Sequence, residues 1–460
     1  MNKKLLPIVL SVLSLLPVTS VYAAEVPASQ TNVNASDKSI KAYLTLFDAI
    51  DVAVKNNYNL KISSERINVA RYQITENAAQ GLPQLTITSG YNRQDPISAS
   101  QNNSAGAIGN NAQFAALLGT ARVNTFQNQV ALSQVLFAGF RIVDGIKLAN
   151  MNVNLAEESF RQARHDVVSN VSTAYYNALK AYQLINVNKV ALKEAEFHID
   201  QAKKLEAAGV GIKLDVVRAT NQLVNSQLQL SQSLNSYERA KKSLNLNMGR
   251  AIDYPIELNA EARVPSFEIN EEKMLQDSLK NRSELKQLVL RREMDEVTTT
   301  IQSRGNWPTI SASVNYNLTD TSVVNSNANN QQNLRYGVNM NWPIFDGLLT
   351  YAKVQRAQNT VIQDQISIDQ QQQSIILEVK QALLDVQEAK ERVILANSSI
   401  NLAEESLKIA RVRYDNGIGI SLDVIEAQGS LNQAKINLVN AEFDLNIGRV
   451  KLYRAMGADI

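Results

Sequence analysis

Apolar side chains recur at helical spacing over two long stretches of the chain. Residues 146–208 and 348–416 contain neither glycine nor proline and are rich in Ala, Leu, Gln, Glu and Lys, which favour helix. The apolar positions step by three and four, a period of 3.5 that predicts left-handed coiled coils. The residues that carry this period are Val168, Val171, Tyr175, Ala178, Tyr182 and Ile185 in the first stretch, and Ile376, Val379, Leu383, Val386 and Val393 in the second, where Lys390 interrupts the pattern at one position.

Glycines mark the point where each long helix is predicted to end. Gly209 and Gly211 follow the first helix, and Gly417 and Gly419 follow the second. Glycine readily takes the left-handed conformation that closes a helix. A further helix is predicted after each turn, at about 212–248 and 420–456, and a shorter one earlier in each half, at about 46–80 and 271–303.

Four short stretches alternate apolar and polar residues instead, which predicts β-strands. They lie at about 84–93, 128–137, 309–318 and 334–343. Each is long enough to cross a bilayer at a tilt, which takes about ten residues. Their polar faces carry serine and asparagine rather than charge, as a water-filled lumen would allow. Soluble hairpins with one solvent-exposed face would show the same alternation of apolar and polar residues.

The same order of elements occurs twice, which indicates tandem duplication of one structural unit. Three matches are separated by 208 positions (345 − 137, 417 − 209, 457 − 249), and upstream matches such as Pro83 with Pro308 by 225. The first copy therefore carries 17 extra residues (225 − 208), which lie between Tyr91 and Val130. Such an insertion is expected in a loop.

The beginning of the chain has the pattern of a secretory signal peptide. Lys3 and Lys4 precede an apolar run from Leu5 to Val18 that is too short to span a bilayer as a helix, and small residues end at Ala23. Removing two lysines would leave 44 basic residues (46 − 2) against 44 acidic ones, so there is no electrostatic reason to bind nucleic acid. The chain has no cysteine.

These patterns divide the chain into five parts. We expect a signal peptide at 1–23, an N-terminal linker at 24–45, a first repeat at 46–250, an inter-repeat segment at 251–270 and a second repeat at 271–460.

The tryptophans and the number of strands favour a membrane location. Trp307 and Trp342 each stand directly before a proline, at the strand ends that face the helices, where an interfacial aromatic belt is expected. Four strands cannot close a barrel, and an open edge in lipid would leave backbone groups unpaired. The chain must then oligomerise, and three copies would supply twelve strands.

The doubled helix–strand–strand–helix–helix unit resembles the TolC-type outer-membrane efflux family over nearly the whole mature chain. The Phe-x-Gly elements after the strands and the two Gly-x-x-x-x-Leu-Asp-Val motifs at the predicted tips carry the same resemblance. It implies a mainly α fold with membrane β: a homotrimer whose twelve-stranded β-barrel in the outer membrane continues into a long periplasmic α-helical coiled-coil barrel. The short segment after residue 250 resembles the equatorial domain that links the two repeats.

The resemblance also implies a function. Such a channel is the exit duct of a tripartite efflux or type I secretion system and is gated at its periplasmic helical tip. Its partners would be a periplasmic adaptor (membrane fusion) protein and an inner-membrane ABC, RND or MFS transporter. The grooves near Gly209 and Gly417 are the expected adaptor contact, and Gly211 and Gly419 belong to the same two tip turns.

Two acids after the second tip turn are candidates for the pore constriction. Asp423 and Glu426 share one helix face, and by the resemblance three chains would present six carboxylates around one axis, which would attract cations. Alternatively, acids in a first helical turn stabilise the helix dipole by about 0.3–1 kcal/mol. The first copy has Arg218 where the second has Glu426, so that Asp215 has a basic neighbour and Asp423 has none. Capping alone does not require this asymmetry.

A candidate gate lies beside these acids. Tyr414 matches a family tyrosine that holds the entrance shut through bridges between helices, with Asp215 as a candidate acceptor, although coiled-coil packing explains Tyr414 equally well. Gly419 stands where the family has an arginine, and Arg218 is a candidate replacement that would reach Asp423 or Glu426.

We expect neither an enzyme nor a cofactor or metal site. The two histidines, His165 and His198, lie far apart on one predicted helix, and the sequence shows no nucleophile elbow or phosphate loop. One function of another class stays open, namely an exported trimeric coiled-coil structural or adhesion protein whose hairpins form a soluble head. Heat-modifiable trimers in the outer-membrane fraction would favour the channel.

Overall fold

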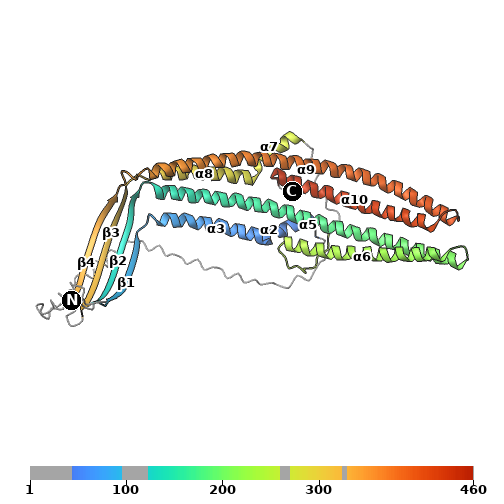
Figure 1. Ribbon diagram of the computed structural model, residues 1–460, viewed down its shortest axis with the longest axis horizontal. Coiled ribbons are helices and arrows are strands. Elements are labelled where there is room, and N and C mark those ends of the chain that lie inside the picture. The colour runs from blue at the N-terminus through green and yellow to red at the C-terminus, as the bar shows by residue number, and fades with distance from the viewer. Residues whose placement is uncertain (1–43, 96–122, 260–269, 324–328, 459–460) are drawn as a thin grey trace, which may run out of the picture. The chain divides into compact units, whose positions relative to one another are not determined.

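A computed structural model describes residues 44–95, 123–259, 270–323 and 329–458 (Figure 1). All of these residues belong to one compact unit. The predicted signal peptide and nearly all of the predicted linker lie outside the described residues. Much of the region that holds the 17-residue insertion and residues 260–269 of the inter-repeat segment also lie outside them.

The order of the elements is the same in both halves of this unit. The first half contains α2 (Leu46–Asn56), α3 (Tyr58–Ala79), β1 (Gln84–Gln94), β2 (Val123–Ala138), α5 (Arg141–Ala207) and α6 (Lys213–Asn247). The second contains α7 (Glu271–Asn281), α8 (Ser283–Ser303), β3 (Thr309–Val323), β4 (Asn329–Asn341), α9 (Leu349–Asp415) and α10 (Ser421–Met456). The two longest helices, α5 and α9, have 67 residues each.

The helices predicted at about 46–80 and 271–303 are each divided in two, which corrects the prediction. Asn57 and Arg282 are the dividing residues, and both have extended backbone, with ψ of 129° and 119°. The side chain of Asn57 accepts a hydrogen bond from the N–H of Asn59, so that a new helix begins there. Neither break contains glycine or proline, and the helical spacing alone therefore gave no sign of it.

The strands form one antiparallel sheet in the order β1-β2-β3-β4. They are longer than predicted, with 16 residues in β2, 15 in β3 and 13 in β4. The connection expected at 319–333 is mostly strand, because its polar residues continue the backbone pairing, for example between Thr319 and Gln331. β4 ends at Asn341, before the predicted residue 343, and the proline at 343 cannot donate a ladder hydrogen bond.

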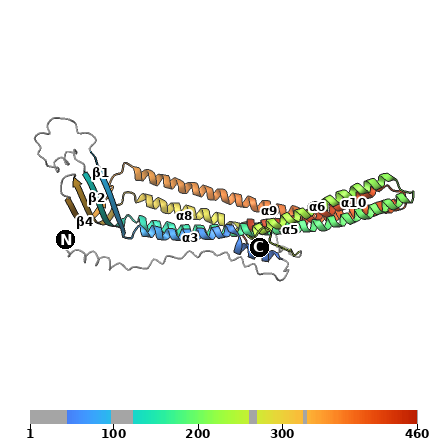
Figure 2. The same ribbon diagram turned by 90° about the horizontal axis from the view of Figure 1, so that it is seen from below.

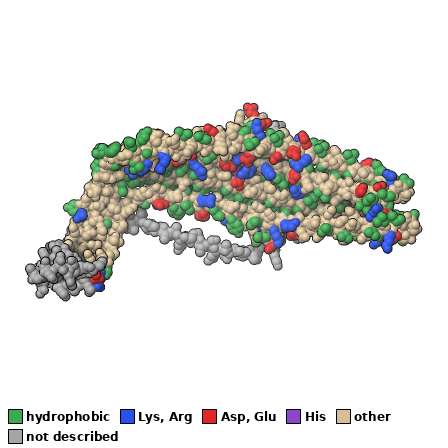
Figure 3. Space-filling view, viewed as in Figure 1, with side chains coloured by type: hydrophobic (Ala, Val, Ile, Leu, Met, Phe, Trp, Pro, Cys, Tyr) green, Lys and Arg blue, Asp and Glu red, His purple; other side chains and the backbone are tan. Residues whose placement is uncertain are grey.

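One face of the sheet is apolar and the other is polar. Ile87, Val130, Tyr316 and Leu334 lie opposite one another across all four strands and so share one face. All four are exposed, between 37% and 74% of their surface. The neighbouring row on the opposite face consists of Thr88, Gln129, Asn317 and Asn333. Figure 3 shows few charged side chains over the strands and many over the helices.

Below the sheet the helices form a single row, and the row changes its members along its length. Next to the sheet the neighbours are α3, α5, α8 and α9 in that order, and towards the tip they are α6, α5, α10 and α9 (Figures 1 and 2). The long helices α5 and α9 belong to both sections. None of the described helices is both long and apolar enough to cross a membrane.

The predicted coiled-coil positions mostly form the core. Val171, Tyr175 and Ala178 of α5 are fully buried in one cluster, and Val379, Leu383 and Val386 of α9 are buried in a second. Three predicted positions lie outside the buried core. Tyr182 is 40% exposed, and its ring lies 5.5 Å from that of Tyr237 on α6. Ile376 is only half-buried because Ile375 takes the core position, and Val393 is half-buried as well.

Candidate functional site: the helical tip and the contacts between the repeats

Two turns with matching geometry join α5 to α6 and α9 to α10. Gly209 and Gly417 have φ of +76° and +73°, the left-handed conformation that side chains disfavour. Gly419 needs to be glycine for another reason, since a Cβ there would lie 3.0 Å from the backbone nitrogen of Tyr414. Gly211 makes the equivalent close approach in the first turn. Both turns close with the same backbone hydrogen bonds.

The outer surface of both turns is apolar. Val210 and Ile418, one in each turn, are 78% and 71% exposed. Ile212 and Ile420, which precede α6 and α10, are 58% and 56% exposed. Such a group of exposed apolar residues is typical of a surface that contacts another protein.

The acidic residues of the two repeats have different partners. In the first repeat the Asp215 carboxylate lies 4.0 Å from the guanidinium of Arg218, one turn along α6. In the second repeat Asp423 is half-buried and Glu426 is exposed. Within the described part of the chain, neither of these two carboxylates has an ion-pair partner. Asp215 is thus the ion-pair partner of Arg218 in this structure.

Tyr414 lies between the repeats, near the end of α9. Its ring lies 5.7 Å from the imidazole of His198 on α5. Burial raises the pKa of Tyr414, the Asp215 carboxylate adds to this effect, and the nearby Ser421 side chain opposes it. Tyr414 and Asp215, two of the residues predicted as gate bridges, therefore lie near each other.

Sequence reasoning missed the role of His198 in this cluster. Its Nε2 atom lies 3.1 Å from the Ser421 Oγ atom, and its side chain is 7% exposed. Burial lowers the pKa of His198 and the nearby Arg411 adds to this effect, whereas Asp215 and Asp415 oppose it. The helical spacing could have indicated that His198 is buried. It lies three residues after Ala195 and four before Ala202, and both alanines are buried on the same face of α5.

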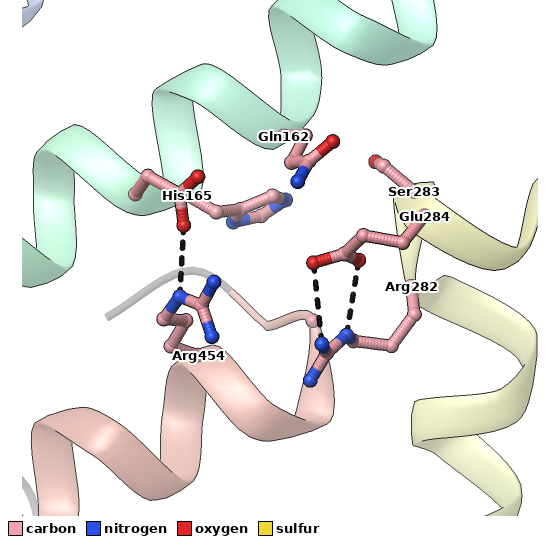
Figure 4. A pocket seen from close by; sticks show the side chains of 8 residues that line it. Gln162, His165, Arg282, Ser283, Glu284 and Arg454 are labelled. Atoms are coloured by element: carbon pink, nitrogen blue, oxygen red, sulfur yellow. Dashed lines mark hydrogen bonds and ion pairs between the residues drawn. The ribbon is translucent and has the colours of Figure 1, made fainter. Parts of the chain in front are cut away.

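A second polar cluster joins the repeats midway along the helices (Figure 4). Arg282 is 4% exposed and donates hydrogen bonds to Glu284 over 3.0 and 3.2 Å and to Glu378 over 2.9 Å. Arg454 of α10 donates to Asp166 of α5 over 2.8 Å and to Glu378 over 2.9 Å. Glu378 therefore links two arginines, and the cluster connects α5, α8, α9 and α10.

The two tryptophans lie at the end of the sheet from which the helices begin, because each is next to a strand in the sequence. Trp307 precedes β3 and packs against Phe137 and Phe140, while the Arg304 guanidinium lies over its ring. Trp342 follows β4 and donates from its indole N–H to the backbone oxygen of Asn306 over 3.1 Å. Both indoles are about half exposed.

A family model described as "Outer membrane efflux protein" matches residues 49–250 and 274–458. The chain belongs to the outer membrane efflux protein family. This membership confirms the resemblance seen in the sequence and the outer-membrane location predicted from it. Among the described residues there is no group of three or more His, Cys, Asp or Glu side chains that could hold a metal ion.

Two relatives of this outer membrane efflux protein match it over different lengths. The toluene efflux pump outer membrane protein TtgC of Pseudomonas putida is 22% identical over 446 residues, which is 94% of this chain and 87% of TtgC. The outer membrane protein TolC of Escherichia coli is 26% identical over 226 residues, or 46% of this chain and 44% of TolC. TtgC and TolC are both outer membrane proteins, and the family is one of efflux channels rather than enzymes.

Solved structures confirm the fold. The crystal structure of CusC superimposes with a TM-score of 0.71 at 18% identity, covering 90% of this chain and 92% of CusC. The CmeC outer membrane channel of Campylobacter jejuni superimposes with a TM-score of 0.70 at 19% identity, covering 90% of this chain and 85% of CmeC.

Proposed function

We propose that three copies of the chain form an outer-membrane channel, the exit duct of a tripartite efflux or type I secretion system. The observation that carries this proposal is that every layer of the protomer is an open row with two unlike edges. The sheet begins at β1 and ends at β4. Near the sheet the helical row runs from α3 to α9, and near the tip it runs from α6 to α9.

The helical edges carry apolar residues that remain exposed in the described part of the protomer. On α9, Leu395, Leu402 and Ile409 are seven residues apart and 53–75% exposed. Val217 and Val224 on α6 have the same spacing and are 57% and 54% exposed. An apolar stripe with heptad spacing is the contact surface of a coiled coil, and these two stripes lack their second helix.

The two unlike edges of the protomer allow identical chains to pair side by side. The first-repeat edge, made of β1, α3 and α6, belongs to one side of the protomer, and the second-repeat edge, made of β4 and α9, belongs to the other. A contact between unlike surfaces generates a cyclic assembly if its rotation closes. We infer three copies because the family resemblance implies a trimer and because three chains would supply twelve strands, a number within the range of outer-membrane barrels.

The apolar face of the sheet fits lipid. Its exposed rows, such as that of Ile87, Val130, Tyr316 and Leu334, would contact acyl chains, while the Ser/Asn/Thr face would line water. Trp307 and Trp342 would then form the interfacial aromatic belt at the end of the sheet from which the helices begin. In this arrangement residues 46–250 and 271–460 are the two repeats of the channel wall, joined by the equatorial segment 251–270 and preceded by the linker 24–45.

The tip would be both the gate and the docking surface. Asp423 and Glu426 of three chains would surround the axis at the constriction, with Tyr414, Asp215 and Arg218 between neighbouring helices. The apolar tip residues, which include Val210 and Ile418, would contact a periplasmic adaptor. That adaptor would connect the channel to an inner-membrane ABC, RND or MFS transporter, as the pump named for the relative TtgC suggests.

Channel formation is tested by reconstituting the purified full-length protein into planar bilayers. We expect trimers with discrete conductance steps. Leu402→Glu, on the unpartnered stripe of α9, should prevent assembly and conductance, because three buried carboxylates would enter the contact. Asn401→Glu adds the same charge at the neighbouring exposed position and should leave both unchanged. A water-soluble trimer without conductance would instead support the structural or adhesion protein.

A further inference from the structure

Two coiled coils meet along a seam in the tip half of the protomer. α5 pairs with α6, α9 pairs with α10, and the contact between α5 and α10 joins the two pairs. In the proposed channel, a movement of one pair relative to the other would open the entrance. The residues that cross this seam would then decide how readily the tip opens.

His198 crosses the seam at the second tip turn. From α5 its imidazole reaches Ser421, the first residue of α10, which is fully buried. The imidazole also lies beside the ring of Tyr414, which comes just before the turn, with the two ring centroids 5.7 Å apart. One side chain of the first coil thus contacts both sides of the turn in the second coil. The ion pair between Glu194 of α5 and Arg411 of α9 crosses the same seam one turn away.

The charged groups that act on the imidazole come from several elements. Arg411 and Asp415 belong to α9 and Asp215 belongs to α6, while α10 contributes the uncharged Ser421. Tyr414 lies beside the imidazole, with the ring planes tilted by 54°, and it is uncharged at neutral pH. Arg411 disfavours a second positive charge, and the two aspartates favour it. Burial is the largest effect and also disfavours it, so the closed seam holds a neutral imidazole.

The direction of the resulting pH dependence follows from linkage. The pKa of His198 is lowered in the closed seam, and it would return to its ordinary value of about 6.5 when the seam opens and water reaches the ring. The closed seam therefore binds fewer protons than the open one. Its stability is complete above about pH 6.5 and declines as the pH falls towards the lowered value, by up to about tenfold in the equilibrium per pH unit.

We propose that the contact between His198 and Ser421 is an acid-sensitive latch that holds the two coils of the tip together and releases when the imidazole takes up a proton. This inference rests on the proposed function, because it supplies the regulation of the entrance. A drop in periplasmic pH would loosen the seam without any change in the partner proteins.

The absence of cysteine from the chain permits a direct test of the seam. Ala202 is 2% exposed and lies one turn beyond His198 on the same face of α5, so Ala202→Cys places a buried thiol in the seam. Lys203→Cys places an exposed thiol next to it. The ratio of their maleimide labelling rates in the full-length protein cancels the effect of pH on the thiol itself. We expect this ratio to rise by up to about tenfold per unit as the pH falls below about 6.5.

Two variants assign the effect to one residue. His198→Gln keeps an amide N–H near the Nε2 position but cannot become charged, and it should make the ratio independent of pH. His165→Gln replaces the other histidine of the chain and should keep the rise. A ratio that does not change with pH in the parent protein, or one that still rises in His198→Gln, would overturn the latch.

Conductance distinguishes this inference from the proposed function. If the channel conducts in planar bilayers, we expect its open probability to increase between pH 7.5 and 5.5 in the parent and to stay constant in His198→Gln. A conducting channel with the same pH response in both proteins contradicts the latch alone. A protein that never conducts, although its seam responds to acid, contradicts the proposed function and not the latch.

Discussion

Arg282 donates a hydrogen bond from its guanidinium to the backbone carbonyl oxygen of Ala455 over 3.1 Å. The first repeat makes the equivalent contact with a smaller side chain, since Asn57 donates to the carbonyl oxygen of Asn247 over 2.7 Å. The donors are 225 positions apart (282 − 57) and the acceptors 208 (455 − 247), the same two offsets that relate the repeats in sequence. The repeats thus keep one contact between a helix start and a helix end, and the second repeat adds charge to it.

Arg282→Ala should therefore destabilise the protein more than Asn57→Ala. Removing Arg282 leaves the carboxylates of Glu284 and Glu378 without one of their partners, and we expect the free energy of unfolding to fall by about 2–4 kcal/mol, less than for a fully buried pair because Glu378 is partly exposed. Asn57→Ala removes a helix cap and one hydrogen bond, worth about 1–2 kcal/mol. Denaturant unfolding in detergent, followed by circular dichroism, measures both. Equal losses would show that the ionic cluster adds no stability.

Two adjacent tyrosines in the core offer a second comparison. Tyr175 and Tyr176 are both fully buried, but only the Tyr175 hydroxyl has partners, the backbone oxygens of Leu44 and Asn259, each at 2.9 Å. The hydroxyl of Tyr176 has no hydrogen-bond partner within the described residues. We expect Tyr175→Phe to lower the free energy of unfolding by about 1–2 kcal/mol and Tyr176→Phe to leave it unchanged or raise it. The opposite order in the same unfolding assay would contradict the hydrogen-bond assignment.

The buried Tyr176 hydroxyl should also make the protein less stable at alkaline pH. Burial raises the pKa of Tyr176 to about 12, while an unfolded tyrosine titrates near 10. The folded state keeps the proton longer, so this contribution is complete below about pH 10 and declines as the pH rises towards 12. Tyr176→Phe should reduce the slope of stability against pH in that window. An unchanged slope would mean that other groups cause the alkaline loss.

Neutralising the acids of the second tip turn should change the channel. Asp423→Asn with Glu426→Gln would remove six charges from a trimer, and we expect weaker cation selectivity and at least about tenfold weaker block by a trivalent cation. Asp215→Asn with Arg218→Gln is the matched control, since it removes an ion pair and leaves the net charge unchanged. Equal selectivity and block in the parent and the first variant would place these acids away from the constriction.

Features that repeat along the chain could be predicted from the sequence. The coiled-coil spacing identified Val171, Val379 and Val386 as core residues, and the alternation of apolar and polar residues located all four strands within the described residues. Features that depend on a single residue could not be predicted. The breaks at Asn57 and Arg282 depend on local capping and on contacts with a distant helix end, and the helical periodicity contains no information about either.

The tip cluster could not be predicted for a similar reason. His198 and Ser421 are 223 positions apart and belong to different repeats, and their contact follows from the way α5 packs against α10. The duplication predicts how each repeat folds, but it does not say which faces of the two copies meet. The strands also ran past their predicted ends, because backbone pairing through Thr319 and Gln331 does not require apolar residues.

Cross-linking of introduced cysteines tests the ring of unlike edges most directly. Val224→Cys places a thiol on the free edge of α6, Leu402→Cys places one on the free edge of α9, and the parent chain has no cysteine. Because heptad spacing allows several registers of one edge along the other, a series of α9 positions seven residues apart (395, 402 and 409) is combined with Val224→Cys. We predict that at least one double variant gives a ladder of dimer and trimer that stops at three chains, and that no single variant cross-links. Monomer in every double variant, or dimers from single variants, would contradict the account.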